Sequence, residues 1–173
     1  MEVITTCSPR NFDLVKSFGA DHVLDYRSDS CMEGIKKLSR NSLRYAIDCV
    51  SEPETMEFCY RCIGRAGGRL TALEPPPKHL HTRPRTVHLD WVLAPVLVGK
   101  PIGWPAPMGR PADPEMREFA KTWFATAQEL LDAGKLRPHP QQVMEGGLPG
   151  ILEGLELIRK HRISGQKLVY PLE

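Results

Sequence analysis

Short apolar runs alternate with amphipathic stretches through the first half of the chain. In the amphipathic stretches apolar side chains recur every three or four positions, which is the period of a helix with one buried face. We expect strands at residues 3–6, 22–26, 45–50 and 69–73, and helices at residues 11–18, 30–38 and 53–63. Strands that alternate with helices predict βαβ units and a parallel sheet. The pattern therefore predicts an α/β fold.

The strand expected at residues 45–50 is apolar apart from Asp48. An apolar run of this kind is typical of a strand that helices cover on both faces. Asp48 either caps the turn that follows the strand or reaches toward a bound ribose. We favour the cap, because aspartate side chains commonly bond to the backbone two or three residues further on.

After Glu74 the regular alternation ends, and three consecutive prolines open a loop. A segment rich in glycine and proline follows at residues 99–107, and such segments break helices and strands. We place a domain boundary near residue 103, so that residues 1–103 form one domain and residues 104–173 a second.

The second domain is predicted to contain the longest helix of the chain, which begins at Asp113-Pro114-Glu115 and ends at Gly134. Its inner face is expected to carry Phe119, Trp123, Ala127, Leu130 and Leu131. A further helix at residues 149–161 and a closing strand at residues 167–170 complete the pattern.

Composition and charge exclude several classes of protein. Hydrophobic residues make up 41% of the 173 residues, which is enough for a packed core, and no apolar run is long enough to span a membrane. The formal net charge is +2, and we expect no face or terminus of the protein to concentrate positive charge. Composition therefore favours neither a nucleic-acid partner nor a membrane partner.

The five cysteines are scattered at positions 7, 31, 49, 59 and 62, and we expect no signal peptide before them. We expect reduced thiols in a cytoplasmic protein. Cys59 and Cys62 form a CxxC pair, which is a redox pair, half of a zinc site or simply part of a helix. We favour the structural role, because no second pair exists and the six histidines lack metal-ligand spacing, so no metal is expected.

The turn after the first strand offers Ser8, Arg10 and Asn11 but no carboxylate before Asp13. In a doubly wound dinucleotide-binding fold, the loop after the second strand meets the adenosine ribose, and basic or hydroxylated side chains there accept the 2′-phosphate of NADP. The alternative is that residues 8–11 merely cap the following helix. Both interpretations remain open on this pattern.

The glycine-rich phosphate loop of a dinucleotide fold is missing. Gly64-Arg65-Ala66-Gly67-Gly68 follows a helix and precedes a strand, which is the wrong context for that motif. If the fold binds a dinucleotide, we expect its first strand and phosphate loop to lie upstream of Met1. Tyr26, at the end of the second strand, either lies against an adenine or covers the sheet.

Several segments resemble the medium-chain dehydrogenase/reductase superfamily and, more narrowly, its zinc-free fungal trans-acting enoyl reductases of polyketide biosynthesis (the lovastatin type). The similarity covers essentially the whole chain. It rests on Cys7-Ser8-Pro9, Tyr45-Ala46-Ile47-Asp48-Cys49, Trp104-Pro105-Ala106-Pro107 and the segment from Ile163 to Val169.

The resemblance implies an α/β fold that is the C-terminal half of such an enzyme. This half is a partial Rossmann-like doubly wound parallel sheet without its first strand, followed by the C-terminal segment of a GroES-like catalytic domain. The groups that hold the substrate carbonyl and the pyrophosphate would lie in the other half, so we name no catalytic residue.

The resemblance also implies site residues. The NADPH contacts would be Ser8, Pro9, Arg10, Asn11, Tyr26, Leu73, Glu74, Ile163 and Ser164. The substrate would be lined by Ala94, Pro95, Val96, Leu97 and Val98. Glu74 departs from the family, in which a neutral side chain such as Asn is expected, and its carboxylate would weaken cofactor binding.

The activity implied is reduction of an α,β-unsaturated acyl thioester by NADPH, with the thioester held on the acyl carrier protein of a polyketide synthase or a hybrid synthase-peptide synthetase. One alternative is a non-catalytic, truncated remnant without turnover. Another is a quinone- or alcohol-type reductase of the same superfamily. Losing the first strand would also expose an apolar sheet edge, which predicts self-association.

Overall fold

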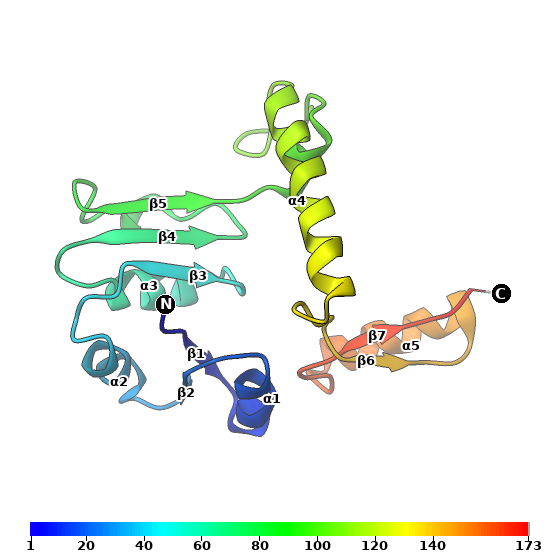
Figure 1. The fold of residues 1–173 in the computed structure, drawn as a ribbon, viewed down its shortest axis with the longest axis horizontal. Helices are drawn as coiled ribbons and strands as arrows, with labels where there is room; N and C mark the ends of the chain where they lie inside the picture. The colour runs from blue at the N-terminus through cyan, green and yellow to red at the C-terminus, as the bar shows by residue number, and fades with distance from the viewer. Residues whose placement is uncertain (173) are drawn as a thin grey trace. The chain divides into compact units, whose positions relative to one another are not determined.

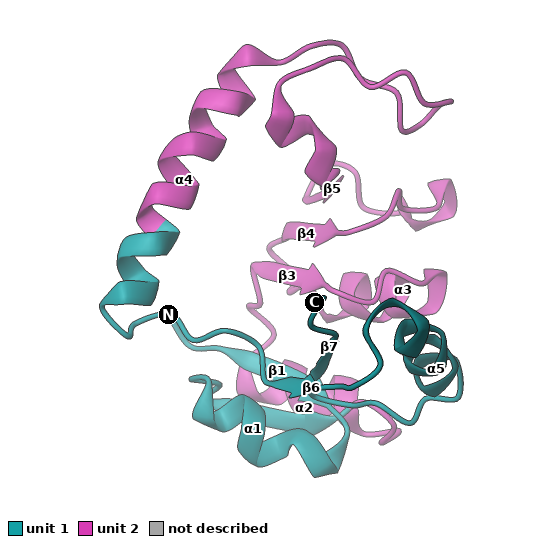
Figure 2. Ribbon diagram, turned by 90° about the vertical axis from the view of Figure 1, so that its right-hand side faces the viewer, with its two compact units in different colours: residues 1–25, 127–173 teal, residues 26–126 magenta. Residues whose placement is uncertain are grey.

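A computed structural model describes residues 1–172. The chain forms two compact units, coloured separately in Figure 2. Unit 1 combines residues 1–25 with the residues from 127 onward, and unit 2 comprises residues 26–126. The division falls inside helix α4 (Pro114–Asp132). The domain boundary expected near residue 103 does not coincide with this division into compact units, and it stays a prediction.

Unit 2 is built on a parallel sheet in the order β3-β4-β5. The strands are β3 (Tyr45–Asp48), β4 (Gly68–Ala72) and β5 (Val87–Trp91), and their arrowheads point the same way in Figure 1. Helix α3 (Pro53–Cys62) packs against β3 and β4, and α2 (Cys31–Leu38) packs against α3. The βαβ pattern predicted from the sequence is confirmed.

Two clusters of buried side chains join α3 to the sheet of unit 2. One consists of Tyr60, Ile63, Leu70 and Val87, and the other of Met56, Ala72 and Leu80. Leu70 and Ala72 of β4, the central strand of this sheet, are fully buried. Each large apolar side chain removed from water contributes about 1.5–3 kcal/mol. These clusters therefore hold α3 on one face of the sheet.

Helix α3 starts where the sequence predicts it. The backbone N–H of Glu52 donates to Thr55 Oγ1 at 3.1 Å, and Pro53 occupies the first helical position, where its missing N–H costs nothing. The helix ends at Cys62, and the turn that follows delivers the chain to β4.

Unit 1 contains two short parallel pairs of strands. Strand β1 (Ile4–Cys7) pairs with β2 (His22–Asp25), and η1 (Pro9–Asn11) and α1 (Phe12–Ser17) connect them. Near the C-terminus β6 (Gln141–Val143) pairs with β7 (Lys167–Val169) around α5 (Gly147–Arg159).

The strand pairing agrees with a doubly wound sheet that lacks its first strand. In the order 3-2-1-4-5-6 the second strand pairs with the third, and the fourth, fifth and sixth follow one another on the other side of the first. The described chain has these two groups as separate sheets, β1-β2 and β3-β4-β5.

Two burial expectations are wrong. Tyr45 and Ile47 of β3 are 66% and 70% exposed, because within unit 2 helix α3 covers the other face of the sheet and leaves theirs open. Phe119 and Trp123 of α4 are 59% and 52% exposed, so these two members of the predicted inner face are not buried.

The remaining elements are short 3₁₀ helices, η2 (Lys78–Leu80) and η3 (Ala94–Val98). Within residues 1–172, no helix is both long enough and apolar enough to cross a membrane.

Candidate cofactor-binding site

The turn that follows β1 presents the candidate phosphate-binding residues at the surface of unit 1. Ser8 has an extended backbone, and the N–H of Asn11 donates to the Ser8 carbonyl at 2.8 Å, which closes the turn. Arg10 lies exposed in the middle of this turn, and among the described residues its guanidinium has no hydrogen-bond or ion-pair partner. Its donors are therefore available to an anion.

Asn11 occupies the N-cap position of α1, but its side chain does not cap the helix. Its amide Nδ2 instead donates to Ser164 Oγ at 2.9 Å, across 153 residues of sequence. The side chain of Ser8 forms no cap hydrogen bond either. The helix-cap interpretation of residues 8–11 is therefore wrong for both side chains.

Gly165 keeps this contact close. A Cβ atom at Gly165 would lie 2.8 Å from Asn11 Oδ1, and its φ of +67° is a conformation that other residues rarely adopt. The glycine thus lets the segment containing Ile163 and Ser164 lie directly against the turn after β1. The structure brings these two groups of predicted cofactor residues together.

The thiol of Cys7, immediately before this turn, is uncharged. Burial, and secondarily the negative charge of Asp25, raises the pKa of this thiol above its ordinary value of 9.0. A neutral thiol does not repel a phosphate, so the end of β1 remains compatible with an anionic ligand.

The second group of candidate residues lies at the carboxyl ends of the strands of unit 2. Leu73 and Glu74 directly follow β4, and the backbone N–H of Leu73 donates to Ser51 Oγ at 2.7 Å. The same hydroxyl donates to the carbonyl of Asp48 at 2.9 Å. Ser51 therefore bridges the end of β3 and the residue after β4.

Asp48 organises the turn beneath this bridge. Its side chain is buried, and Oδ1 accepts hydrogen bonds from the backbone N–H groups of Val50 at 2.9 Å and Ser51 at 3.0 Å. Oδ2 accepts from Thr55 Oγ1 at 2.7 Å. The prediction that Asp48 caps the turn is confirmed, and three hydrogen bonds hold its carboxylate in this turn.

The predicted substrate-lining residues form η3 (Ala94–Val98), just beyond the carboxyl end of β5. The N–H of Val92 donates to the carbonyl of Ala72 at 3.0 Å, which joins the ends of β5 and β4. Within unit 2 the structure therefore places the predicted substrate residues, Leu73 and Glu74 at the same edge of the sheet. Parallel sheets bind ligands at this edge.

Tyr26 begins unit 2, directly after β2. Its side chain is 50% exposed, and the guanidinium of Arg27 lies 5.3 Å from the centre of its ring. An exposed aromatic ring at this position offers a flat surface for an adenine. That role stays a prediction.

The two cysteines of the CxxC pair lie in α3. Burial is the largest cause that raises the pKa of Cys59 to about 12 and that of Cys62 to about 11. Both thiols therefore stay protonated at neutral pH and are poor nucleophiles and metal ligands. Within residues 1–172 no three His, Cys, Asp or Glu side chains converge to hold a metal ion.

The sequence matches known proteins in a way that agrees with this fold. A family model described as zinc-binding dehydrogenase matches residues 1–87. The chain belongs to this family. Enoyl reductases and dehydrogenases of the family use nicotinamide cofactors. Despite the zinc in the family's name, the described residues do not fit a zinc site, and we derive no chemistry from a metal.

Similar family members are trans-enoyl reductases of fungi. One from Gibberella zeae is 65% identical over 167 residues, which cover 96% of this chain and 46% of the relative. One from Petromyces alliaceus is 50% identical over 170 residues, which cover 98% of this chain and 47% of the relative. The chain thus spans about half the length of these relatives.

Solved structures share the fold at low sequence identity. The CurK enoyl reductase superposes with a TM-score of 0.73 at 14% identity, over 98% of this chain and 47% of that chain. The alcohol dehydrogenase of Aeropyrum pernix superposes with a TM-score of 0.59 at 21% identity, over 93% of this chain and 40% of that chain. These similarities confirm the predicted α/β fold with parallel sheets.

Proposed function

We propose that this chain is part of an NADPH-dependent, trans-acting enoyl reductase of polyketide biosynthesis. The substrate is an α,β-unsaturated thioester carried on the acyl carrier protein of a polyketide synthase or a hybrid synthase-peptide synthetase. The observation that carries the proposal is the joined pair Asn11 and Ser164 beside an exposed Arg10, in a chain whose relatives are trans-enoyl reductases.

The chemistry of the turn after β1 favours NADPH over NADH. The turn contains the guanidinium of Arg10 and the hydroxyl of Ser8, and Asp13 is the nearest carboxylate along the chain. A ribose 2′-hydroxyl is usually bound by a carboxylate, whereas a 2′-phosphate is bound by arginine and hydroxyl groups. In this proposal Ser8, Pro9, Arg10 and Asn11 hold the 2′-phosphate end of the cofactor, with Ile163 and Ser164 alongside.

The residues at the carboxyl edge of unit 2 have complementary roles in this proposal. Ser51 and Asp48 hold the backbone of Leu73, and Leu73 and Glu74 in turn position the cofactor. The apolar residues Ala94–Val98 line the acyl chain and exclude water from it. When bound here, NADPH would supply a hydride to the β-carbon of the unsaturated thioester, and a proton would then add to the α-carbon.

The five cysteines of the chain are all free thiols. Free thiols are typical of proteins in reducing compartments. We therefore place the proposed reaction in the cytoplasm.

Cofactor titration tests the proposal. The fluorescence of the chain's tryptophans, titrated with NADPH and with NADH, should show tighter binding of NADPH. Arg10→Ala should weaken NADPH binding about tenfold or more and leave NADH binding nearly unchanged, since a charge-assisted hydrogen bond contributes about 1.5–3 kcal/mol. Lys16→Ala is the matched control, because Lys16 is an exposed cation on α1 with no role in the proposal.

Turnover separates the proposal from the alternatives. Reduction of a crotonyl thioester, with quinones and alcohols inert, would support the enoyl reductase. Turnover of quinones with the thioester inert would show a quinone-type reductase. A monodisperse chain that binds neither cofactor would show a non-catalytic remnant, and equal NADPH affinity in Arg10→Ala would overturn the phosphate-site assignment.

A further inference from the structure

Three loops at one edge of unit 2 carry arginines and no carboxylates. They are the loops that precede β3, β4 and β5, at residues 39–44, 63–67 and 81–86. We call these loops the arginine edge. Their cations are Arg40, Arg44, Arg65, Arg83 and Arg85. Because the three strands are parallel, their amino ends lie on the same side of the sheet, and the five arginines collect there although they are spread along the sequence.

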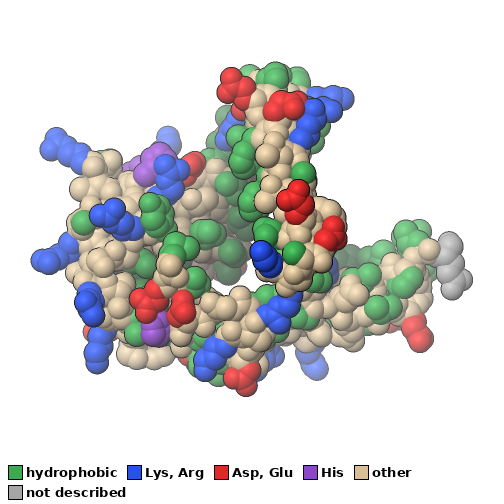
Figure 3. All heavy atoms as spheres, viewed as in Figure 1, with side chains coloured by type: hydrophobic (Ala, Val, Ile, Leu, Met, Phe, Trp, Pro, Cys, Tyr) green, Lys and Arg blue, Asp and Glu red, His purple; other side chains and the backbone are tan. Residues whose placement is uncertain are grey.

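The opposite edge of the same sheet differs in charge. The loops that follow β3 and β4, at residues 49–52 and 73–77, contain Glu52 and Glu74 and no lysine or arginine. In Figure 3 the Lys and Arg side chains project along the side of unit 2 where β3, β4 and β5 begin. The sheet therefore separates a cationic edge from the edge that carries the predicted ligand-binding residues.

Backbone hydrogen bonds fix the three loops to one another. The N–H of Gly64 donates to the Leu43 carbonyl at 2.9 Å, and the N–H of Gly68 donates to the Thr86 carbonyl at 2.9 Å. At Gly67, where φ is +86°, a Cβ atom would lie 2.0 Å from the Thr86 carbonyl oxygen, so only glycine permits this approach. The arginine edge is therefore a preorganised surface and not a set of independent loops.

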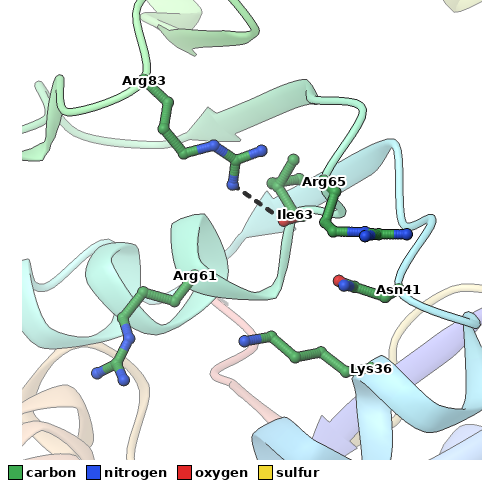
Figure 4. Close-up of a pocket in the computed structure, with 6 residues that line it drawn as sticks. All are labelled: Lys36, Asn41, Arg61, Ile63, Arg65 and Arg83. Carbon is green, nitrogen blue, oxygen red and sulfur yellow. Dashed lines mark hydrogen bonds between the residues drawn. The ribbon is translucent and has the colours of Figure 1, made fainter.

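The side chain of Arg83 joins the loops as well. It is half-buried, and its guanidinium donates to the carbonyl of Ile63 at 3.1 Å and to that of Gly64 at 2.6 Å. Figure 4 shows the hydrogen bond from Arg83 to Ile63 beside a hollow of about 330 Å³. Lys36 and Asn41 point into this hollow, while the guanidinium of Arg61 turns away from it. Lys36, near the end of α2, thus adds a cation to the arginine edge, whereas Arg61 pairs with Glu57 on its own helix.

Within residues 1–172, the exposed arginines of this edge lack ion-pair partners. Arg40, Arg44, Arg65 and Arg85 are exposed, and in the described part of the chain none of them forms an ion pair. Like charges held close together repel each other, so an anionic partner gains the attraction of several guanidinium groups at once. The planar guanidinium fork also matches a carboxylate in a two-point contact.

We propose that the arginine edge docks an acidic, carboxylate-bearing segment of the partner synthase. This inference rests on the proposed function, because a trans-acting reductase must meet a separate protein. Docking at the amino ends of the strands leaves the carboxyl edge, with Leu73, Glu74 and Ala94–Val98, open to substrate. The loops contain no Phe, Tyr or Trp on which nucleic-acid bases would stack, which favours a protein over a nucleic acid.

The test uses fluorescence anisotropy with labelled octaglutamate as the probe and octaglutamine as the neutral control peptide. The wild-type chain should bind octaglutamate, more weakly as salt rises, and should not bind octaglutamine. The combined variant Arg44→Glu, Arg65→Glu and Arg85→Glu should bind octaglutamate about tenfold or more weakly. The combined control Lys16→Glu, Lys135→Glu and Lys167→Glu, with the same change in net charge at exposed sites of unit 1, should lose less than about twofold.

Three results would overturn the proposal: unchanged binding in the arginine variant, equal losses in both variants, or tighter binding of oligothymidine than of octaglutamate. Replacing the same three arginines by glutamine provides a second variant should the glutamate variant not fold. NADPH titration of each variant separates the two proposals. If the wild-type chain binds octaglutamate but not NADPH, the arginine edge stands and the proposed function fails.

Discussion

The side-chain amide of Asn11 donates a hydrogen bond of 2.9 Å to the hydroxyl of Ser164. This bond joins the turn after β1 to the segment before β7, which are 153 residues apart in sequence. Both residues are half-buried, and Gly165 lies against the same asparagine. A surface turn at one end of the chain is thereby held by a segment at the other end, and the two supply most of the proposed phosphate-binding groups.

We expect Asn11→Ala and Ser164→Ala each to lower the free energy of unfolding by about 1 kcal/mol, as for a typical side-chain hydrogen bond. The double variant should lose less unfolding free energy than the sum of the two single losses, because both single variants remove the same hydrogen bond. Urea unfolding of the four proteins measures this coupling. Ser17→Ala removes a more exposed hydroxyl near the end of α1 and serves as the control. Strict additivity of Asn11→Ala and Ser164→Ala would show that the bond contributes nothing.

Glu74 places a carboxylate at the edge where the cofactor is proposed to bind. Replacing it with the uncharged, similarly shaped Gln should increase NADPH affinity by about twofold to fivefold at low salt, because the repulsion between an exposed carboxylate and the cofactor phosphates is removed. The gain should shrink as salt rises. Glu54→Gln, an equivalent change at an exposed position of α3, should leave the affinity unchanged. Equal gains in both variants would show only an effect of net charge.

Asp48 accepts three hydrogen bonds while buried at the end of β3. Asp48→Ala leaves two backbone N–H groups and the Thr55 hydroxyl without this partner and should cost about 3 kcal/mol or more of unfolding free energy. Asp48→Asn should cost less, because its amide oxygen still accepts from Val50 and Ser51. Urea denaturation provides the measurement. A loss in Asp48→Ala no larger than that in Glu54→Gln would contradict the role assigned to this carboxylate.

The thiols of Cys59 and Cys62 make stability depend on pH in the alkaline range. Both pKa values are raised from the ordinary 9.0, to about 12 and about 11, so the folded chain holds these protons more tightly than the unfolded chain. The stabilisation is fully present below pH 9.0 and is lost as pH rises through the folded-state values.

Raising the pH from about 8 to about 10 should therefore lower the unfolding free energy by about 1 kcal/mol for each of these thiols. The variant Cys59→Ala with Cys62→Ala should be less stable at pH 8 and should lose less on the same change of pH. Urea unfolding at the two pH values checks this. Ser17→Ala, which removes an exposed hydroxyl of α1, provides the control and should leave the pH dependence unchanged.

The local elements could be predicted because their determinants are local. Pro53 and Thr55 mark the start of α3, and the apolar spacing from Met56 to Tyr60 identifies its buried face. Strand β5 was not predicted. The polar side chains of His88 and Asp90 alternate with its apolar residues, so this strand contains no continuous apolar run. The burial of Tyr45 and Ile47 was predicted wrongly, since an apolar run does not show whether helices cover one face of a strand or both.

The sequence by itself determined the α/β class, the positions of the helices and most strands, and the residues that could meet a phosphate. The tertiary structure decided that Asn11 meets Ser164 and does not cap its helix, and that Ser51 bridges β3 and β4. It also decided where the arginines gather. The expectation that no face concentrates positive charge is therefore wrong. A parallel sheet brings the starts of successive strands to one edge, and Arg44, Arg65 and Arg85 each lie just before a strand.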